Sequence, residues 1–425
     1  MKSVKTISLL LFAFLCAFLT GCTNIFEHGN IEGLIVDKTD NSFVIMNKND
    51  TLYQINNSID VPVGKYVRIK YYGNLDYLKK SIIDIIIVEE IENPFYNEIM
   101  LYVNKLSTEE KIGQLIMAKV PNSNKIETIT NYHVSGYIYF AHDIGNKTIA
   151  QIQEEIKNYQ NHSKIPMLMA IDEEGGTVSR LNHNKNITKE TFRSPQYLYN
   201  NGGYEKITED AIRKRDLLVE LGFNVNYAPV IDVVTDTNAY MYQRSFGKDA
   251  NETAIFATTI LNTQTNEMTY TFKHFPGYGN NVDTHVYKSN DNRSLSDFDN
   301  SDFIPYKAAI NNGAKQIMVS HNIINKIDNK PSSLSLYMHN ILRERLGFKG
   351  VIITDSLSMS AITKYESNPY VEAVKAGNNL LITANSEETF NDIKEACENG
   401  IITNELLSRL VYRVIELKMN KGMIA

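Results

Sequence analysis

Hydrophobic residues follow two different patterns along the chain, and the change falls near Asn93-Pro94. Before that point, short apolar runs alternate with polar residues and are separated by turn residues. This pattern predicts five strands, at 31–37, 42–47, 51–55, 66–72 and 82–90. Five short strands in succession favour a small all-β domain over 31–92, either a barrel of the OB type or a roll.

This first domain carries no recognisable catalytic group, since its acids are scattered and residues 31–92 contain neither His nor Cys. We therefore expect a spacer or a module that contacts the cell wall. A polymer-binding role stays open because aromatic side chains can stack on a glycan, and the domain holds Tyr53, Tyr66, Tyr71, Tyr72 and Tyr77.

From residue 95 onward, apolar runs of strand length alternate with amphipathic stretches of helical period. There are eight such runs, at 115–120, 135–140, 166–171, 224–233, 270–275, 316–320, 350–354 and 379–383. Ser107 and Glu110 form a capping box that opens the first helix. Eight strand–helix units predict an α/β fold, a (β/α)₈ barrel over 95–425. A doubly wound sheet is the rival, but no Gly-x-Gly-x-x-Gly follows any of the runs.

The N-terminus looks like the signal of a bacterial lipoprotein. Lys2 and Lys5 precede an apolar run over 7–19, which is short for a membrane span, and the run leads into Gly21-Cys22. We expect residues 1–21 to be a cleaved signal peptide, Cys22 to carry the lipid and residues 22–30 to be a tether. Two acyl chains are enough for stable anchoring, so the protein is expected on the extracytoplasmic face of the bacterial cell membrane.

Composition narrows the class further. The chain has 43 Lys+Arg against 49 Asp+Glu and a net charge of −6, which leaves no basic excess for binding nucleic acid. Only Cys16, Cys22 and Cys397 are present, so a disulfide framework is excluded once Cys16 is removed and Cys22 modified. The fold must then be held by its hydrophobic core.

Chemistry in a (β/α)₈ barrel sits at the carboxyl ends of the strands. Five of the eight runs end in or beside a charged or titratable side chain: Asp172, Asp232, Lys273-His274, His321 and Asp355. Chance placement would not favour one mouth of the barrel so consistently. This concentration predicts an enzyme without reference to any family.

Five segments at these positions closely resemble the family 3 glycoside hydrolases, in the exo-β-N-acetylglucosaminidase (β-hexosaminidase) branch. They are IDEEGGTVSR (171–180), GFNVNYAPVIDV (222–233), RSFG (244–247), KHFPGYGNNVDTH (273–285) and GVIITDSLSMSAI (350–362). They occur in the family's order and span most of 95–425, whereas 31–92 has no counterpart.

The resemblance implies a retaining enzyme with Asp355 as nucleophile, although Ser356 replaces the second acid that usually follows. It also implies an acid/base pair, Asp283 and His285, on the loop after the fifth strand. That loop is one residue shorter here than in the better-known members. A neutral imidazole avoids the repulsion that a second carboxylate would feel beside the nucleophile.

Further roles implied by the resemblance are in substrate binding, at Asp172, Arg244, Lys273, His274 and Tyr278. Tyr278 stands where the family usually has a second His. Glu173 is a weaker candidate of the same kind. We expect supporting roles for Asp232 and His321, a structural ion pair for Arg180, and either a pocket or a packing role for Met359. No cofactor and no metal are expected.

The expected function is hydrolysis of terminal β-linked GlcNAc from a glycan by a monomer. Only Ile424-Ala425 follow the last expected helix, so the acid/base should come from within the barrel. Muropeptides, chitin oligosaccharides and glycoprotein glycans all remain candidate substrates, and either water or phosphate could be the acceptor. The alternatives are a family 3 β-glycosidase of other sugar specificity and a catalytically weak, lipid-anchored glycan-binding protein.

Overall fold

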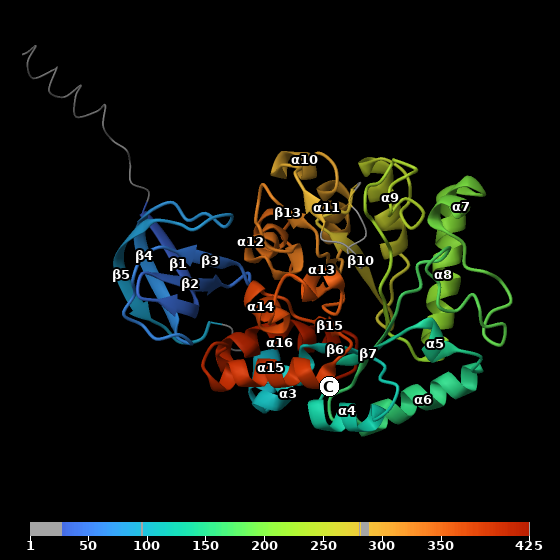
Figure 1. Cartoon of the computed structure of the whole chain (residues 1–425), viewed down its shortest axis with the longest axis horizontal. Coiled ribbons are helices and arrows are strands. Elements are labelled where there is room, and N and C mark those ends of the chain that lie inside the picture. Colours follow the sequence, from blue (N-terminus) through green and yellow to red (C-terminus); the bar gives the residue numbers. More distant parts are fainter. Residues whose placement is uncertain (1–27, 95–96, 280, 282–288, 425) are drawn as a thin grey trace, which may run out of the picture.

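The computed structural model describes residues 28–94, 97–279, 281 and 289–424. The chain forms a small β domain followed by a larger α/β barrel, and the two lie side by side (Figure 1). Within the described residues, no helix has both the length and the apolar character needed to cross a membrane.

The β domain is one five-stranded antiparallel sheet in the order β3-β2-β1-β4-β5. Its strands are β1 (His28–Thr39), β2 (Ser42–Asn47), β3 (Leu52–Ile55), β4 (Tyr66–Gly73) and β5 (Ile83–Glu90). A parallel bridge between Ile55 and Ser81 brings the β3 edge to the start of β5, so the sheet curls into a partly open barrel. All five predicted strands are present, and the small all-β domain is confirmed.

The second domain is a (β/α)₈ barrel, as predicted. Its parallel strands pair in the order β14-β12-β10-β9-β8-β7-β6-β15, and a bridge between Ile353 and Leu380 closes the ring. The strands are β6 (Ile116–Lys119), β7 (Gly136–Tyr139), β8 (Leu168–Ile171), β9 (Val225–Asn226), β10 (Thr269–Phe275), β12 (Gln316–Val319), β14 (Val351–Thr354) and β15 (Leu381–Thr383). Two short strands, β11 (Asn290–Asp291) and β13 (Ile323–Ile324), pair separately.

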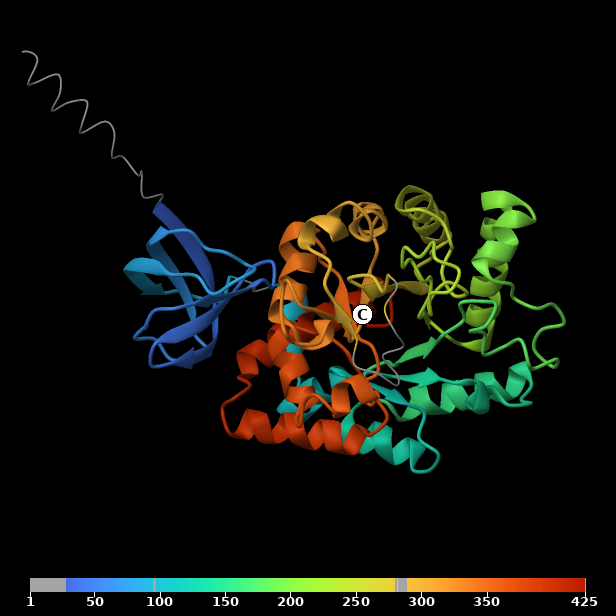
Figure 2. The ribbon, with the colours of Figure 1, turned by 45° about the horizontal axis from the view of Figure 1, so that its top comes forward.

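Helices surround the barrel (Figure 2). They are α2 (Glu98–Asn104), α3 (Thr108–Gln114), α4 (Lys125–Tyr132), α5 (Ala141–Ile144), α6 (Ile149–His162), α7 (Pro195–Asn200), α8 (Gly203–Leu221), α9 (Ala250–Leu261), α10 (Leu295–Asp299), α11 (Phe303–Asn311), α12 (Leu336–Asn340), α13 (Ser360–Thr363), α14 (Pro369–Ala376), α15 (Ser386–Glu398) and α16 (Asn404–Asn420). A 3₁₀ turn, η1 (Ser332–Leu334), precedes α12, and a π-helical turn, η2 (Ile341–Arg345), extends it. The predicted capping box at Ser107 and Glu110 opens α3.

One predicted strand is much shorter than expected. The run over 224–233 forms a ladder only at β9, and the rest continues as irregular backbone. Pro229 has no N–H to donate to a ladder. The segment still follows β10, because Ile231 donates to the carbonyl of Lys273 at 2.9 Å. It therefore carries Asp232 to the mouth of the barrel without regular pairing.

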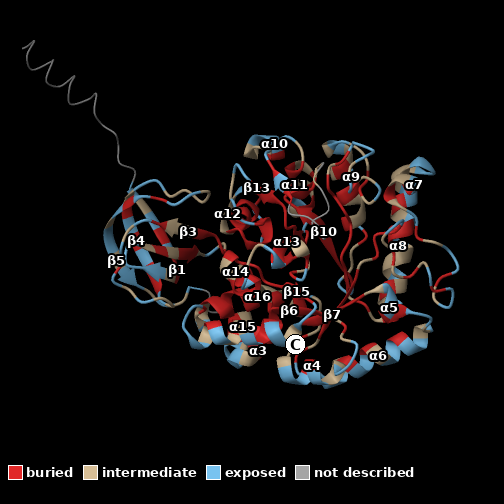
Figure 3. Ribbon diagram, viewed as in Figure 1, coloured by how far each residue is buried: buried red, intermediate tan, exposed pale blue. Residues whose placement is uncertain are grey.

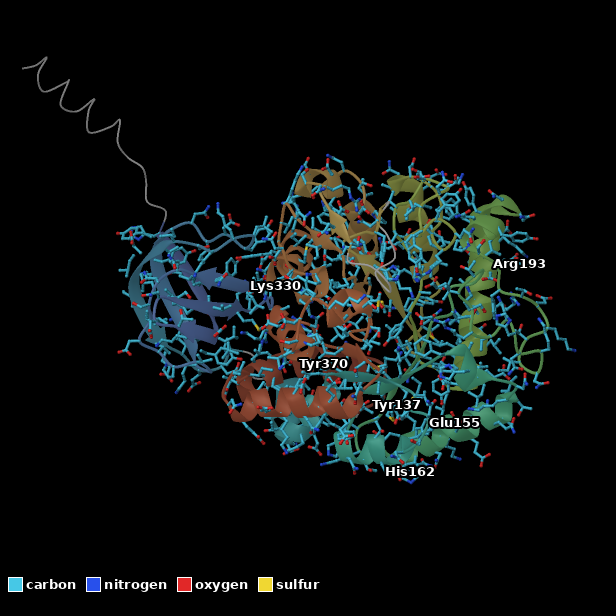
Figure 4. All side chains as sticks on the ribbon, viewed as in Figure 1. Tyr137, Glu155, His162, Arg193, Lys330 and Tyr370 are labelled. Atoms are coloured by element: carbon cyan, nitrogen blue, oxygen red, sulfur yellow. The ribbon has the colours of Figure 1, made fainter. Side chains whose placement is uncertain are left out.

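One hydrophobic cluster extends across both domains. Leu34, Met46 and Leu52 of the β domain belong to the same buried cluster as the residues packed between the barrel strands and the surrounding helices, whereas the barrel interior forms a separate cluster with Leu168 and Ile353 (Figure 3). Asn340 of α12 reinforces the contact, since its side chain bonds both the N–H and the carbonyl of Leu52, at 2.9 and 2.7 Å. A groove remains at the junction, where Lys330 pairs with Glu372 at 2.7 Å (Figure 4).

A buried ion cluster also joins the domains. Asp50, in a turn of the β domain, contacts Arg409 and lies 2.8 Å from the Nε atom of Arg413, both on α16. Burial alone would raise the pKa of Asp50, but the two arginines reverse that effect and lower it. The carboxylate is therefore ionised at neutral pH and balances the cations of α16.

We expect Asp50→Asn to lower the free energy of unfolding by about 3 kcal/mol, because the substitution leaves buried guanidinium groups without their counter-charge. Asn fits the site otherwise, since Asp50 has a φ of 65° and Asn tolerates the left-handed region. Denaturant titration would measure the change, with Asp60→Asn as the exposed control in the same domain. Equal stability of the two variants would show that the cluster does not hold the domains together.

Candidate active site

A cavity of about 470 Å³ opens at the carboxyl ends of the barrel strands. Its lining includes Asp172 after β8, Lys273 and His274 on β10, and Asp355 after β14. Arg244, which lies between β9 and α9, also lines it. The barrel thus brings together five of the predicted site residues from four separate parts of the chain.

The wall of the cavity on the β8 and β10 side is a chain of alternating charges. The ammonium of Lys273 lies 2.8 Å from a carboxylate oxygen of Asp172 and 2.8 Å from one of Glu174. Arg244 forms a two-pronged contact with Glu174, at 3.0 Å from Nε and 2.7 Å from Nη2. Arg180 pairs with the other oxygen of Asp172 at 3.1 Å. This order of opposite charges fixes the five side chains in one arrangement.

The charges stay ionised in spite of their burial. Burial would raise the pKa of both carboxyl groups, but Lys273 and Arg180 lower the pKa of Asp172, and Arg244 and Lys273 lower that of Glu174. For Lys273 burial acts to lower the pKa, while the two carboxylates raise it above its usual value. The wall therefore presents charged hydrogen-bond donors and acceptors to the cavity at neutral pH, which suits a ligand with several hydroxyl groups.

His274 is held in a fixed orientation from behind. Its Nδ1 atom lies 2.8 Å from Oδ2 of Asp232, and Asp232 also accepts from the backbone N–H groups of His274 and Tyr278, at 3.2 and 2.8 Å. A carboxylate accepts only, so we assign the proton to Nδ1. The Nε2 atom then faces the cavity, 3.4 Å from Arg244. Asp232 acts here as a support for His274, the kind of role expected for it.

Asp355 follows the last residue of β14, and the backbone around it is well fixed. Its N–H donates to the carbonyl of Val319 at 2.9 Å, and its Oδ1 accepts from the N–H of Ser356 at 2.7 Å. His321 contacts the carbonyl of Ser356 through Nε2 at 3.0 Å and the hydroxyl of Ser333 through Nδ1 at 2.7 Å. His321 thus supports the turn that carries Asp355 and does not line the cavity.

Several candidate residues lie elsewhere. Tyr278 is not part of the cavity lining, because its ring is 2% exposed and packs in a small apolar cluster with Val230 and Met241, edge-on to His274. Glu173 is buried behind the wall, where it accepts from the N–H groups of Arg180 and Leu181 at 2.9 and 3.1 Å. Met359 differs from these two residues, because it does line the cavity.

Three predicted residues lie outside the described part of the chain. Asp283 and His285, the expected acid/base pair, and Cys22, the expected lipid site, are not placed. Their roles remain predictions from the sequence. Among the described residues, no cluster of three His, Cys, Asp or Glu side chains is arranged to hold a metal ion.

Two charged residues of the cavity lining, Glu174 and Lys119, were not singled out from the sequence. Glu174 belongs to a quoted motif, but nothing in the sequence says that it joins Lys273 to Arg244. Lys119 ends β6 and could have been found by the strand-end argument that singled out the other strands. Its ammonium lies 5.2 Å from the ring centre of Phe140, which follows β7.

Comparisons with known proteins agree with this geometry. The family model described as "Glycosyl hydrolase family 3 N terminal domain" matches residues 107–417. A protein of Nitrosomonas eutropha named "Beta-hexosaminidase" is 29% identical over 275 residues, which cover 61% of this chain and 76% of that protein. A Cellulomonas fimi protein named "Beta-N-acetylglucosaminidase/beta-glucosidase" is 26% identical over 343 residues, covering 75% of this chain and 58% of that protein.

A solved structure has the same fold. It is that of a glycoside hydrolase family 3 beta-N-acetylglucosaminidase from Paenibacillus sp. str. FPU-7, with a TM-score of 0.70 and 29% sequence identity. The match covers 75% of this chain and 64% of the Paenibacillus chain.

Proposed function

We propose that this chain, which belongs to glycosyl hydrolase family 3, is a retaining exo-β-N-acetylhexosaminidase that removes terminal β-linked GlcNAc from cell-wall or chitin-type glycans. That it is a glycoside hydrolase follows from the family and from relatives named "Beta-hexosaminidase". The finer proposal is carried by one observation: Asp355 faces the same cavity as the charged wall of Asp172, Lys273 and Arg244.

In the proposed reaction, Asp355 is the nucleophile and His285 is the acid and then the base. Asp355 attacks the anomeric carbon and forms a glycosyl ester, while the bond from that carbon to the leaving oxygen breaks. His285, oriented by Asp283, gives its proton to the departing oxygen. In the second step His285 takes a proton from water, the water oxygen attacks the same carbon, and Asp355 leaves as a carboxylate. Two inversions return the product to the β configuration.

The charged wall binds the sugar ring during both steps. Asp172 accepts hydrogen bonds from hydroxyl groups, and Lys273, Arg244 and His274 offer donors or an acceptor beside it. Because these groups already hold one another in place, they need little reorganisation when the sugar enters. A position fixed to within a fraction of an ångström is what nucleophilic attack by Asp355 requires.

The proposed specificity for β-GlcNAc over β-glucose can be tested directly with aryl glycosides. The chain should release aryl alcohol from an aryl β-GlcNAc at least ten times more efficiently than from the matching β-glucoside, measured as kcat/KM. The same assay with inorganic phosphate separates the acceptors, since water gives GlcNAc and phosphate gives GlcNAc 1-phosphate. A preference for the glucoside would favour the second activity in the name of the Cellulomonas relative, and no release from any aryl glycoside would overturn the proposal.

We expect Glu174→Gln to lower kcat/KM on the aryl β-GlcNAc about a hundredfold, because Lys273 and Arg244 lose the carboxylate that positions them. Glu155→Gln is a matched control. Glu155 lies on the outer helix α6 (Figure 4), where it pairs with Lys147 at 2.7 Å and accepts from the hydroxyl of Tyr139 at 2.8 Å, and it does not line the cavity. If both variants kept wild-type kcat/KM, the charged wall would not be part of the sugar site.

The proposal places the enzyme on the extracytoplasmic face of the membrane through a lipid on Cys22. We expect Cys22→Ala to be released into the soluble fraction or to remain unprocessed, because the acyl chains are the stable anchor. Cys16→Ala, within the predicted signal peptide, should stay membrane-bound as the wild type does. Fractionation and the size of the mature chain measure both. A Cys22→Ala protein that is processed and still membrane-bound would contradict the lipid anchor.

A further inference from the structure

The outer face of the β domain carries an exposed apolar end. Ile82, just before β5, is 76% exposed, the highest value among the large apolar side chains of the described residues, and Ile86 and Ile87 on β5 are 42% and 44% exposed. On the neighbouring strands the ring of His28 of β1 packs against that of Tyr72 of β4, with ring centres 4.2 Å apart and the planes tilted by 47°. Isoleucines this exposed are unusual on a sheet edge that faces water.

The other end of the same face carries ion pairs between side chains of β1, β4 and β5. Arg68 of β4 lies 2.6 Å from Glu32 of β1 and 3.2 Å from Glu89 of β5, and Lys65 pairs with Glu90. Ile82 and the His28–Tyr72 pair therefore lie at the end where β1 begins, Ile86 and Ile87 lie at the middle of β5, and the charged pairs lie beyond them.

Cationic side chains accompany the isoleucines. Lys79 and Lys80 come directly before Ser81-Ile82 and are exposed, and Lys70 of β4 pairs in register with Ile87. Lys79 lies 3.3 Å from Asp76, but an exposed ion pair of this kind is weak, so the ammonium of Lys79 can still interact with an anionic surface. Apolar, tyrosine and lysine side chains together are typical of surfaces that lie at a lipid headgroup layer.

The chain itself brings this end close to the proposed lipid. His28 pairs in register with Tyr72, and Tyr72 pairs with Asp84 near the start of β5, so Asp84 lies about 10 Å from the beginning of β1 and Ile82 lies two residues beyond it. Cys22 precedes His28 by six residues, which span at most about 20 Å when fully extended. A lipid on Cys22 would thus hold the bilayer surface within reach of these side chains.

We propose that the β5 patch, defined as Tyr72, Lys79, Lys80, Ile82, Ile86 and Ile87, lies against an anionic lipid surface and docks the β domain on the membrane. The inference rests on the lipid anchor of the proposed function. β5 lies on the side of the β domain that faces away from the barrel (Figures 1 and 3). When this patch is docked, the β domain therefore lies between the bilayer and the barrel.

A second copy of the chain is the competing occupant, because β5 pairs with β4 alone among the described strands and leaves an exposed strand edge. The positions of the lysines and the short reach to Cys22 favour the lipid surface.

The test uses the mature chain, residues 22–425, with Cys22→Ser so that no lipid is attached, and vesicles of phosphatidylglycerol and phosphatidylcholine in equal parts. We expect co-sedimentation of the wild-type patch with these vesicles, and a partition roughly tenfold weaker for Ile82→Asp/Ile86→Asp. Lys79→Gln/Lys80→Gln should weaken binding by a similar factor on these vesicles, but not on phosphatidylcholine alone. Asp84→Asn, which removes an exposed carboxylate beside the patch, should strengthen it.

Ile255→Asp is the matched control, since Ile255 on α9 of the barrel is 50% exposed and far along the chain from the patch. Equal partition of Ile82→Asp/Ile86→Asp and the wild type, or no binding by the wild type, would overturn the proposal. So would a dimer in the absence of vesicles that the same double variant abolishes. Hydrolysis of soluble aryl β-GlcNAc by every variant is measured in parallel, so that a failure of the proposed function is distinguished from a failure of docking.

Discussion

Asp355→Asn is expected to lower kcat on an aryl β-GlcNAc by at least about a thousandfold while the protein stays folded. The amide has nearly the shape of the carboxylate but cannot form the glycosyl ester, so the two-step route is lost. The side chain is partly exposed at the mouth of the barrel. The backbone N–H of Asp355 still donates to Val319 in the variant, and the amide oxygen of Asn can accept from the N–H of Ser356 as Oδ1 does. The thermal melting curve should therefore change little.

Azide provides the specific control for this variant. With Asp355→Ala, a small anion can occupy the space of the lost carboxylate and attack the same carbon, which should restore part of the rate on activated aryl glycosides. Asp328→Asn should keep wild-type kcat, because Asp328 accepts from the hydroxyl of Ser335 and lies outside the cavity lining. More than a tenth of wild-type kcat in Asp355→Ala without azide would exclude Asp355 as the nucleophile.

His285→Ala should have an effect that depends on the leaving group. A poor leaving group needs a proton as it departs, so kcat/KM for such substrates should fall about a thousandfold, whereas an activated nitrophenol should leave almost unaided. The second step still needs a base, so the glycosyl ester should accumulate and give a burst of nitrophenol. A series of aryl β-GlcNAc substrates of graded leaving-group pKa, with pre-steady-state kinetics, measures both effects.

Asp283 and His285 are expected to act as one unit. Asp283→Asn should reproduce part of the His285→Ala phenotype, and the double variant should be little worse than His285→Ala alone. A dependence on leaving-group pKa no steeper than that of the wild type would rule out His285 as the general acid. Among the described residues, His274 is the imidazole that lines the cavity; its Nδ1 atom lies 2.8 Å from Asp232 and its Nε2 atom lies 3.4 Å from Arg244.

The architecture was predictable from the sequence because periodicity is a local signal. Runs of strand length between amphipathic stretches mark the eight barrel strands, and short alternating runs mark the five strands of the β domain. The error at 224–233 has an equally local cause, since the apolar run continues past Asn226 while Pro229 prevents the ladder from continuing. Hydrophobicity alone does not report a missing hydrogen-bond donor.

The candidate site was predictable only in part. Strand ends identify which residues face the mouth of the barrel, and on this basis Asp172, Lys273 and Asp355 were expected together. How the charges are paired is a property of the folded state. That Glu174 contacts both Lys273 and Arg244, and that Tyr278 turns into an apolar cluster, depends on loop paths that no spacing rule describes.

The junction between the domains carried no signal in the sequence at all. Asp50 and Arg409 are 359 positions apart, and each is an unremarkable charged residue in its own segment. Their contact appears only when α16 packs against the β domain. The same holds for Asn340, whose amide replaces a strand partner for Leu52 of β3.

The central claim is that the enzyme hydrolyses β-GlcNAc with retention through Asp355, and the configuration of the first product tests it most directly. Proton NMR would follow the anomeric signals of GlcNAc as an aryl β-GlcNAc is turned over. Our account predicts that β-GlcNAc appears first and that the α-anomer grows in only later by mutarotation. If α-GlcNAc appeared first, a single displacement by water would be taking place, and the role given to Asp355 would be wrong.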